Sequence, residues 1–172
     1  ILYPKIDDKS IFSKINDEIF NYFQIKTLTS FVTGVSTFLI LYSFKSDLAI
    51  FFGIIAFLLN FIPFIGSLIS VLLPFIFSLI QFLDFFQSSM IMIFLIIIQL
   101  FVGNFIEPKL IGKSLNLSPI VMLLTLSIMS KLWGISGMFL SIPILVVLLI
   151  VFSNFNSTKK YAIFLSEKGQ IR

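Results

Sequence analysis

The chain has 172 residues, of which 58% are hydrophobic and only 12% are charged, and its mean hydropathy is +1.11. Soluble domains carry about 25% charged residues, which cover their surface. Most of the charged side chains here lie in residues 1–26 and 159–172, so the long central region is almost uncharged. This composition excludes a soluble globular domain and indicates an integral membrane protein.

The absence of Cys and His from the sequence removes several classes of function. The chain can form no disulfide, no Cys/His metal site and no Ser-His-Asp triad. The sequence also has no glycine-rich phosphate-binding loop. We therefore expect no enzyme, no cofactor and no bound metal. The net charge of +4 comes from basic residues near the chain ends, which indicates membrane topology rather than nucleic-acid binding.

The first segment, residues 1–27, has an amphipathic pattern. Apolar residues such as Ile11, Ile15 and Ile19 recur at helical spacing, and polar residues fill the gaps. The pattern predicts a helix that lies on the membrane surface or packs against an upstream segment. The chain opens at Ile1 rather than Met, and we expect further protein upstream of it.

The uncharged runs that follow differ in length. Residues 28–44 and 85–106 each fit one membrane crossing. The run 48–83 would form a helix ~54 Å long, against a hydrocarbon core of ~30 Å. We therefore expect it to enter, turn and return on one side, either as two thin crossings or as a re-entrant hairpin.

A break near the middle of this run carries polar and helix-breaking residues. Pro63 is expected to stop the first arm, Gly66 to let the chain turn and Ser67 to cap the second arm, which contains Pro74. Asn60 adds the polar side chain. A broken helix is tolerated within a membrane only when it is buried in protein or lines a wet cavity. The break is therefore either part of a solute pathway or a kink satisfied by neighbouring helices.

A second broken run repeats this design near the C-terminus. Ser118 and Pro119 form a helix start, Gly134 and Gly137 interrupt the helix, and Pro143 lies in the second arm. The first arm is only ~21 Å long, which favours a re-entrant hairpin. The predicted organisation is all-α and polytopic, with a surface helix at 1–27, a transport region at 28–152 containing hairpins 48–83 and 119–152, and a cytoplasmic tail at 153–172.

The helix 85–106 and its end carry a polar stripe. Gln99, Gly103 and Glu107 lie at positions i, i+4 and i+8, and Asn104 lies beside Glu107. Polar groups in lipid are costly, so the stripe is expected to face a solute pathway or to form hydrogen bonds between helices.

Glu107 stands at the end of this helix, directly before Pro108, where the helix dipole disfavours a negative charge. We therefore expect Lys109 or Lys113 to compensate it in an ion pair near the membrane interface.

The basic residues predict the orientation. Ten of them lie in residues 1–26, 107–113 and 159–172, whereas the opposite side has only Lys45 and Lys131. The positive-inside rule makes the ten-residue side cytoplasmic, with both chain ends there. The two hairpins then enter from opposite faces, which is typical of secondary transporters.

Three motifs in this order resemble the autoinducer-2 exporter family of bacterial membrane proteins, over about residues 10–152. The motifs are Asn60–Gly66 with Pro74; Gln99, Gly103 and Asn104 with Pro108–Ser114 (including Gly112) and Leu117–Pro119; and Trp133–Met138 with Pro143. The resemblance implies the C-terminal half of a multi-pass inner-membrane transporter, a homo-oligomer in the lipid bilayer that exports a small polar solute such as autoinducer-2.

Two other functions stay open at this point. Some relatives in the family are cation/proton antiporters, and Glu107, with Asp84, would be the titrating site in that case. Alternatively, the breaks are packing devices in a membrane scaffold protein that transports nothing. Glu107, Asn116 and Lys131 stand where the family pattern favours small residues.

Overall fold

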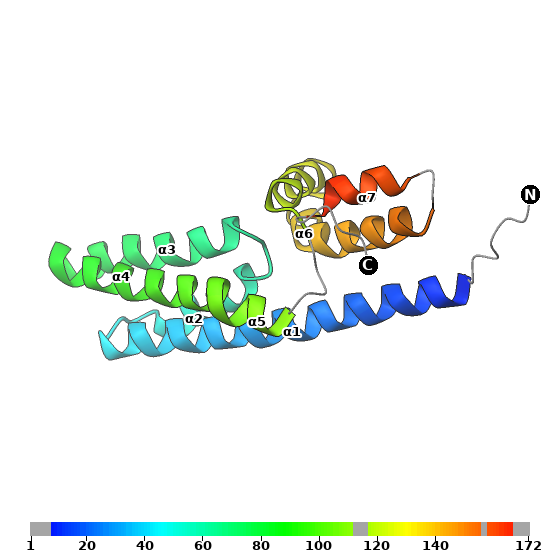
Figure 1. The fold of residues 1–172 in the computed structure, drawn as a ribbon. Helices are drawn as coiled ribbons and strands as arrows, with labels where there is room; N and C mark the ends of the chain where they lie inside the picture. The colour runs from blue at the N-terminus through cyan, green and yellow to red at the C-terminus, as the bar shows by residue number, and fades with distance from the viewer. Residues whose placement is uncertain (1–7, 112–116, 156–157, 167–172) are drawn as a thin grey trace, which may run out of the picture. The chain divides into compact units, whose positions relative to one another are not determined.

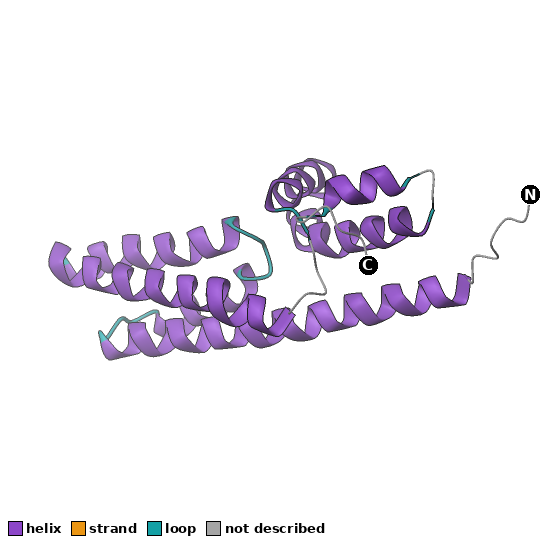
Figure 2. Ribbon diagram, in the orientation of Figure 1, coloured by secondary structure: helices purple, strands orange, loops and turns teal. Residues whose placement is uncertain are grey.

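The computed structural model describes residues 8–111, 117–155 and 158–166, so Gly112 lies outside the described residues (Figure 1). Within these ranges every regular element is a helix, apart from one isolated bridge between Leu117 and Ser166 (Figure 2). The elements are α1 (Asp8–Ser43), α2 (Ala49–Leu59), α3 (Ile65–Phe82), α4 (Phe85–Phe101), the π-helix η1 (Val102–Ile106), α5 (Glu107–Ile111), α6 (Pro119–Asn154) and α7 (Lys159–Leu165). The predicted all-α fold is confirmed.

Four stretches of helix in the described part of the chain are long and apolar enough to cross a membrane: Ile11–Ser43, Ile65–Phe82, Phe85–Leu110 and Pro119–Asn154. Helix α2 is apolar too, but its 11 residues make it only ~17 Å long, too short to cross a ~30 Å core. The chain is therefore a polytopic helical membrane protein.

The chain divides into two compact units, which we describe separately. The α1–α5 unit comprises Gln24–Gly112, and the α6–α7 unit comprises Ile1–Phe23 with Lys113–Arg172. Helix α1 contributes to both units and runs without interruption past the end of the predicted surface helix. A surface position for residues 1–27 stays a prediction.

In the α1–α5 unit, α2 and α3 form a helical hairpin whose two ends are fastened together. The Gln81 side chain near the end of α3 accepts hydrogen bonds from Ser46 Oγ and from the Asp47 N–H, both at 3.2 Å. Its amide nitrogen donates to the Lys45 carbonyl at 3.1 Å. The run 48–83 thus returns to the end where it starts, as predicted, while its depth in a membrane stays a prediction.

The core of this unit joins α1, α2, α3 and α4. Its buried residues are Leu41, Ala49, Phe52, Val71, Ile91 and Leu95. Helices α1 and α2 approach each other closely at two glycines. A Cβ atom on Gly34 would lie 2.8 Å from the Gly53 carbonyl oxygen, so only residues without a side chain allow this spacing.

In the α6–α7 unit, α6 consists of two arms joined at Gly134, whose φ of 62° and ψ of −137° are not helical. The second arm folds back so closely that a Cβ atom on Gly137 would overlap the Met129 carbonyl. The predicted interruption of this run is therefore confirmed. Pro119 occupies the first turn as expected, and Ser118 holds the N-cap position without a side-chain capping bond.

The core of the α6–α7 unit places Tyr22 of α1 against both arms of α6. Pro143 is buried within the second arm. Helix α7, which the sequence did not predict, packs on α6, and Ser118 N–H donates to the Leu165 carbonyl at 3.0 Å. Part of the predicted tail is therefore folded.

Candidate functional site

The break Asn60–Gly66 is a compact turn in which five backbone N–H groups donate to protein carbonyls. The Ile62 N–H donates to the Leu59 carbonyl at 2.8 Å, and the Gly66 N–H donates to the Ile62 carbonyl at 3.1 Å. Pro63 has no N–H to satisfy. Phe64 takes a positive φ of 60°, which redirects the chain into α3. These bonds reduce the number of polar groups that water would have to satisfy at the break.

The one amide side chain at the break is bound by α1. Asn60 is 7% exposed, and its Nδ2 donates to Oγ of the fully buried Ser30 at 3.0 Å. Because an unpaired buried amide is costly, this bond fixes the tip of the hairpin to α1. The contact agrees with the second interpretation of the break, a kink satisfied by a neighbouring helix.

Ser67 does not cap the second arm, and that expectation is wrong. Helix α3 begins two residues earlier, with Phe64 at the N-cap, so Ser67 lies inside the first turn and its Oγ donates to the Phe64 carbonyl at 2.9 Å. Gly66 is buried, and a Cβ atom there would overlap the Leu59 carbonyl. The glycine is thus required for the close return of the chain, as predicted.

The helix that carries the predicted polar stripe contains a π-helix, η1, between α4 and α5. Pro108 lies two residues after the end of η1. A proline lacks an N–H, and its ring clashes with the carbonyl four residues earlier, here that of Asn104. The wider turns of η1 relieve this clash and shift the helical register. Gln99 is half-buried, whereas Gly103 and Asn104 are exposed. The structure therefore does not keep these residues on one buried face.

Glu107 pairs with Lys26 of α1. Lys26 Nζ lies 2.7 Å from Glu107 Oε1, and the two side chains are 7% and 20% exposed. Of the two expected partners, Lys109 is exposed and does not pair with Glu107 in the structure, and Lys113 lies outside the described residues, so that alternative stays a prediction. Sequence reasoning placed Lys26 in a basic terminal segment and missed the long-range contact.

The same face of α1 carries a row of buried hydroxyl residues that the sequence analysis also missed. The row continues from Lys26 through Thr29, Ser30, Thr33 and Thr37. Thr29 Oγ1 donates to the Lys26 carbonyl at 3.1 Å, and Thr33 Oγ1 donates to the Thr29 carbonyl at 2.9 Å. The spacing of three and four positions was a readable signal, because polar residues in a membrane helix face protein.

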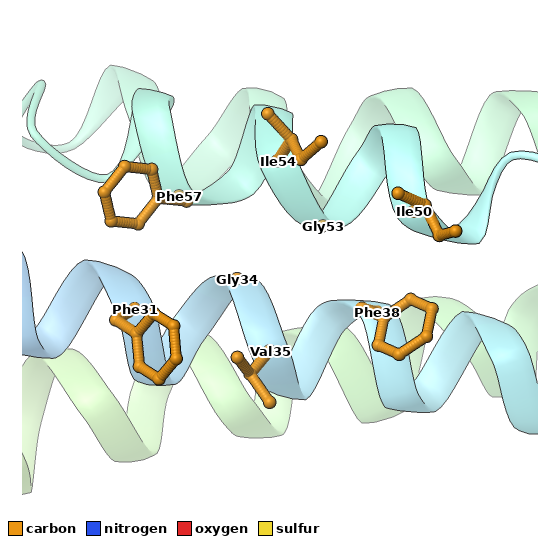
Figure 3. A pocket seen from close by; sticks show the side chains of 8 residues that line it. All are labelled: Phe31, Gly34, Val35, Phe38, Ile50, Gly53, Ile54 and Phe57. Atoms are coloured by element: carbon orange, nitrogen blue, oxygen red, sulfur yellow. The ribbon is translucent and has the colours of Figure 1, made fainter.

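A groove of about 370 Å³ lies over the close crossing of α1 and α2 (Figure 3). Gly34 and Gly53 face each other where the two helices meet, and the large side chains around them are apolar. The lining residues are Phe31, Gly34, Val35, Phe38, Ile50, Gly53, Ile54 and Phe57. This groove is unsuited to a polar solute.

The described residues contain no candidate metal site, because no three of their Asp or Glu side chains come together. The polar features of the α1–α5 unit include the Ser30–Asn60 contact, the η1 segment and the Lys26–Glu107 pair. Together with the two broken helical hairpins, they define a multi-pass helical membrane protein with polar groups at its helix interruptions.

Comparison with known proteins identifies the family. Residues 3–157 match the AI-2E family of transporters, and the chain belongs to this family. The resemblance seen in the sequence is confirmed, and a transporter family is consistent with the expectation of no enzyme.

Curated relatives extend this finding. The chain is 37% identical over 155 residues to a "Putative transport protein" of Borreliella burgdorferi, covering 88% of this chain and 42% of the relative. A protein of the same description from Haemophilus influenzae is 38% identical over 149 residues, covering 87% of this chain and 42% of the relative. The AI-2 transport protein TqsA of Escherichia coli is 31% identical over 151 residues, covering 88% of this chain and 44% of the relative. The chain spans about two fifths of the length of these relatives.

Proposed function

We propose that this chain forms part of a transporter that moves a small polar solute across a bacterial inner membrane. The observation that carries the proposal is the match to the AI-2E transporter family over residues 3–157. The similarity to the AI-2 transport protein TqsA supports a solute of the autoinducer-2 type. Export as the direction rests on the sequence resemblance alone.

The exposed polar groups of η1 are our first candidates for the solute pathway. Gly103 and Asn104 are exposed on a helix whose surroundings are mostly large apolar side chains. Lipid cannot satisfy the Asn104 amide, so this face needs water, solute or protein against it. Gln99 and Glu107 lie about one helical turn before and after Gly103 and Asn104 along the same helix.

The Asn60–Gly66 break, with Pro63 and Ser67, is the second candidate part of the pathway. Its position at the tip of a hairpin resembles the interrupted helices that bind solutes in secondary transporters. The backbone hydrogen bonds within the break favour a different function, a scaffold in which the turn is only a packing device. Water access to the break distinguishes the two functions.

We also propose that both chain ends are cytoplasmic and that the protein forms a homo-oligomer in the lipid bilayer. The ten-to-two distribution of basic residues supports the orientation. Within the α1–α5 unit, Lys26 and Glu107 lie together at one end, and Lys45 and Gln81 lie together at the other. This arrangement agrees with one crossing before the α2–α3 hairpin and one after it.

The test is solute flux in vesicles that contain the full-length protein. We expect flux of a furanosyl polyol to depend on the protein and to fall at least several-fold in Asn104→Leu, which removes the exposed amide. Phe105→Leu, the exposed apolar neighbour, is the matched control and should keep the native flux. Protein-containing vesicles that pass no solute of a polar panel faster than empty ones would contradict the transport proposal.

A further inference from the structure

We propose that the Lys26–Glu107 pair is a latch that fastens the η1–α5 segment to α1, with the π-helix as the hinge. Beyond Val102, which is 1% exposed, the helix loses its packing. From Gly103 to Leu110, only Ile106 and Glu107 are half-buried and the other six residues are exposed. The charged contact at 2.7 Å is therefore a main attachment of this segment to the α1–α5 unit.

The π-helix supplies the point about which the segment can move. A π-helical turn is rare and less favourable than an α-helical one, and Pro108 disfavours a regular α-helix over the turn that precedes it. A Cβ atom on Gly103 would meet no heavy atom within 4 Å, so this turn is not packed against a neighbour at that point. Loss of the ion pair should let the segment swing at η1 while α4 stays in place.

The burial of the pair makes each of its two charges depend on the other. A salt bridge in an exposed position contributes little, but a lysine that is 7% exposed depends on its partner for compensation of its charge. The latch is therefore closed while both charges are present. Its role in opening or closing the Gly103–Asn104 face to solute rests on the proposed transport function.

The test measures distances in the full-length protein, with spin labels on cysteines introduced in pairs. These 172 residues contain no Cys, and any Cys elsewhere in the full-length protein is first replaced by Ser. One pair joins Leu110 of α5 to Leu58 of α2; the control pair joins Phe94 of α4, ahead of the hinge, to the same Leu58. All three positions are exposed.

The variant K26M/E107Q removes both charges, so that neither is left buried alone. We expect it to broaden the Leu110–Leu58 distance distribution and to leave the Phe94–Leu58 distribution as narrow as in the native protein. Lys109→Met, which neutralises an exposed lysine on the same segment, should change neither distribution.

An unchanged Leu110–Leu58 distribution in K26M/E107Q would overturn the latch. Equal broadening of both distributions would also overturn it, because the whole unit would then have loosened. Neither measurement requires solute, so a native protein that carries no solute would remove the transport proposal and leave this result standing.

Discussion

Asn60 at the tip of the α2–α3 hairpin donates a hydrogen bond of 3.0 Å to Ser30 on α1, and both residues are buried. The contact joins positions 30 apart in the sequence and connects a helix break to a row of hydroxyl side chains. It makes the interrupted helix part of a packed polar interface.

This contact gives a prediction about stability. Ser30→Ala should leave the Asn60 amide short of a partner and lower the free energy of unfolding by about 1–3 kcal/mol. Asn60→Leu combined with Ser30→Ala removes both polar partners and should cost less than the sum of the two single changes. Unfolding of the four proteins in detergent measures this coupling. Ser127→Ala, whose exposed hydroxyl bonds only its own helix, is the control.

Two glycines give a matched pair for a steric prediction. Gly66→Ala places a Cβ atom on the Leu59 carbonyl and should destabilise the fold by about 1–3 kcal/mol or prevent folding. Gly103→Ala meets no heavy atom within 4 Å and should keep the native yield. Folded yield and melting temperature in detergent distinguish the two variants. Equal behaviour would mean that the chain does not return closely at Gly66.

The turn within α6 gives a prediction of a different kind, because the strain is in the backbone. Gly134 has a φ of 62° and a ψ of −137°, a region used almost only by glycine, although there is room for a side chain. Gly134→Ala should therefore cost about 1–3 kcal/mol from conformational strain alone. Chemical unfolding of this variant beside Gly103→Ala checks the value. A cost near zero would show that the two arms of α6 do not need this conformation.

The proposed orientation can be tested within one unit. Asp47→Cys and Lys109→Cys are both exposed and lie at opposite ends of the α1–α5 unit. A membrane-impermeant thiol reagent applied to intact cells should label the first position and not the second. Labelling of both positions from outside would contradict the proposed topology.

The sequence predicts the helical breaks well because local residues cause them. Pro63 with Gly66, and Gly134 with Gly137, act through backbone conformation and the absence of a side chain, and the structure turns at both places. The polytopic helical architecture follows in the same way from the length of the uncharged runs.

Long-range partners were not predictable from one sequence. The predicted stripe of Gln99, Gly103 and Glu107 required a regular α-helix, in which residues four apart share a face. The π-helix before Pro108 changes the helical register, so these residues no longer share one face. The partner of Glu107 lies 81 positions away, at Lys26, where local spacing favoured Lys109. Helix α7 was missed because seven residues with two lysines give too short a pattern.

The central claim, that polar helix interruptions line a solute pathway, is tested most directly by cysteine accessibility in the membrane. Single cysteines are placed at Asn60, Pro63, Ser67, Gln99, Gly103 and Asn104 of the full-length protein, with Ile97 as an exposed apolar control on α4. A water-soluble thiol reagent is applied with and without the transported solute. We expect reaction at several of the six positions, slowed by solute, and no reaction at Ile97. If none of the six positions reacts while Asp47→Cys does, the interruptions are dry, and the scaffold function replaces the transporter.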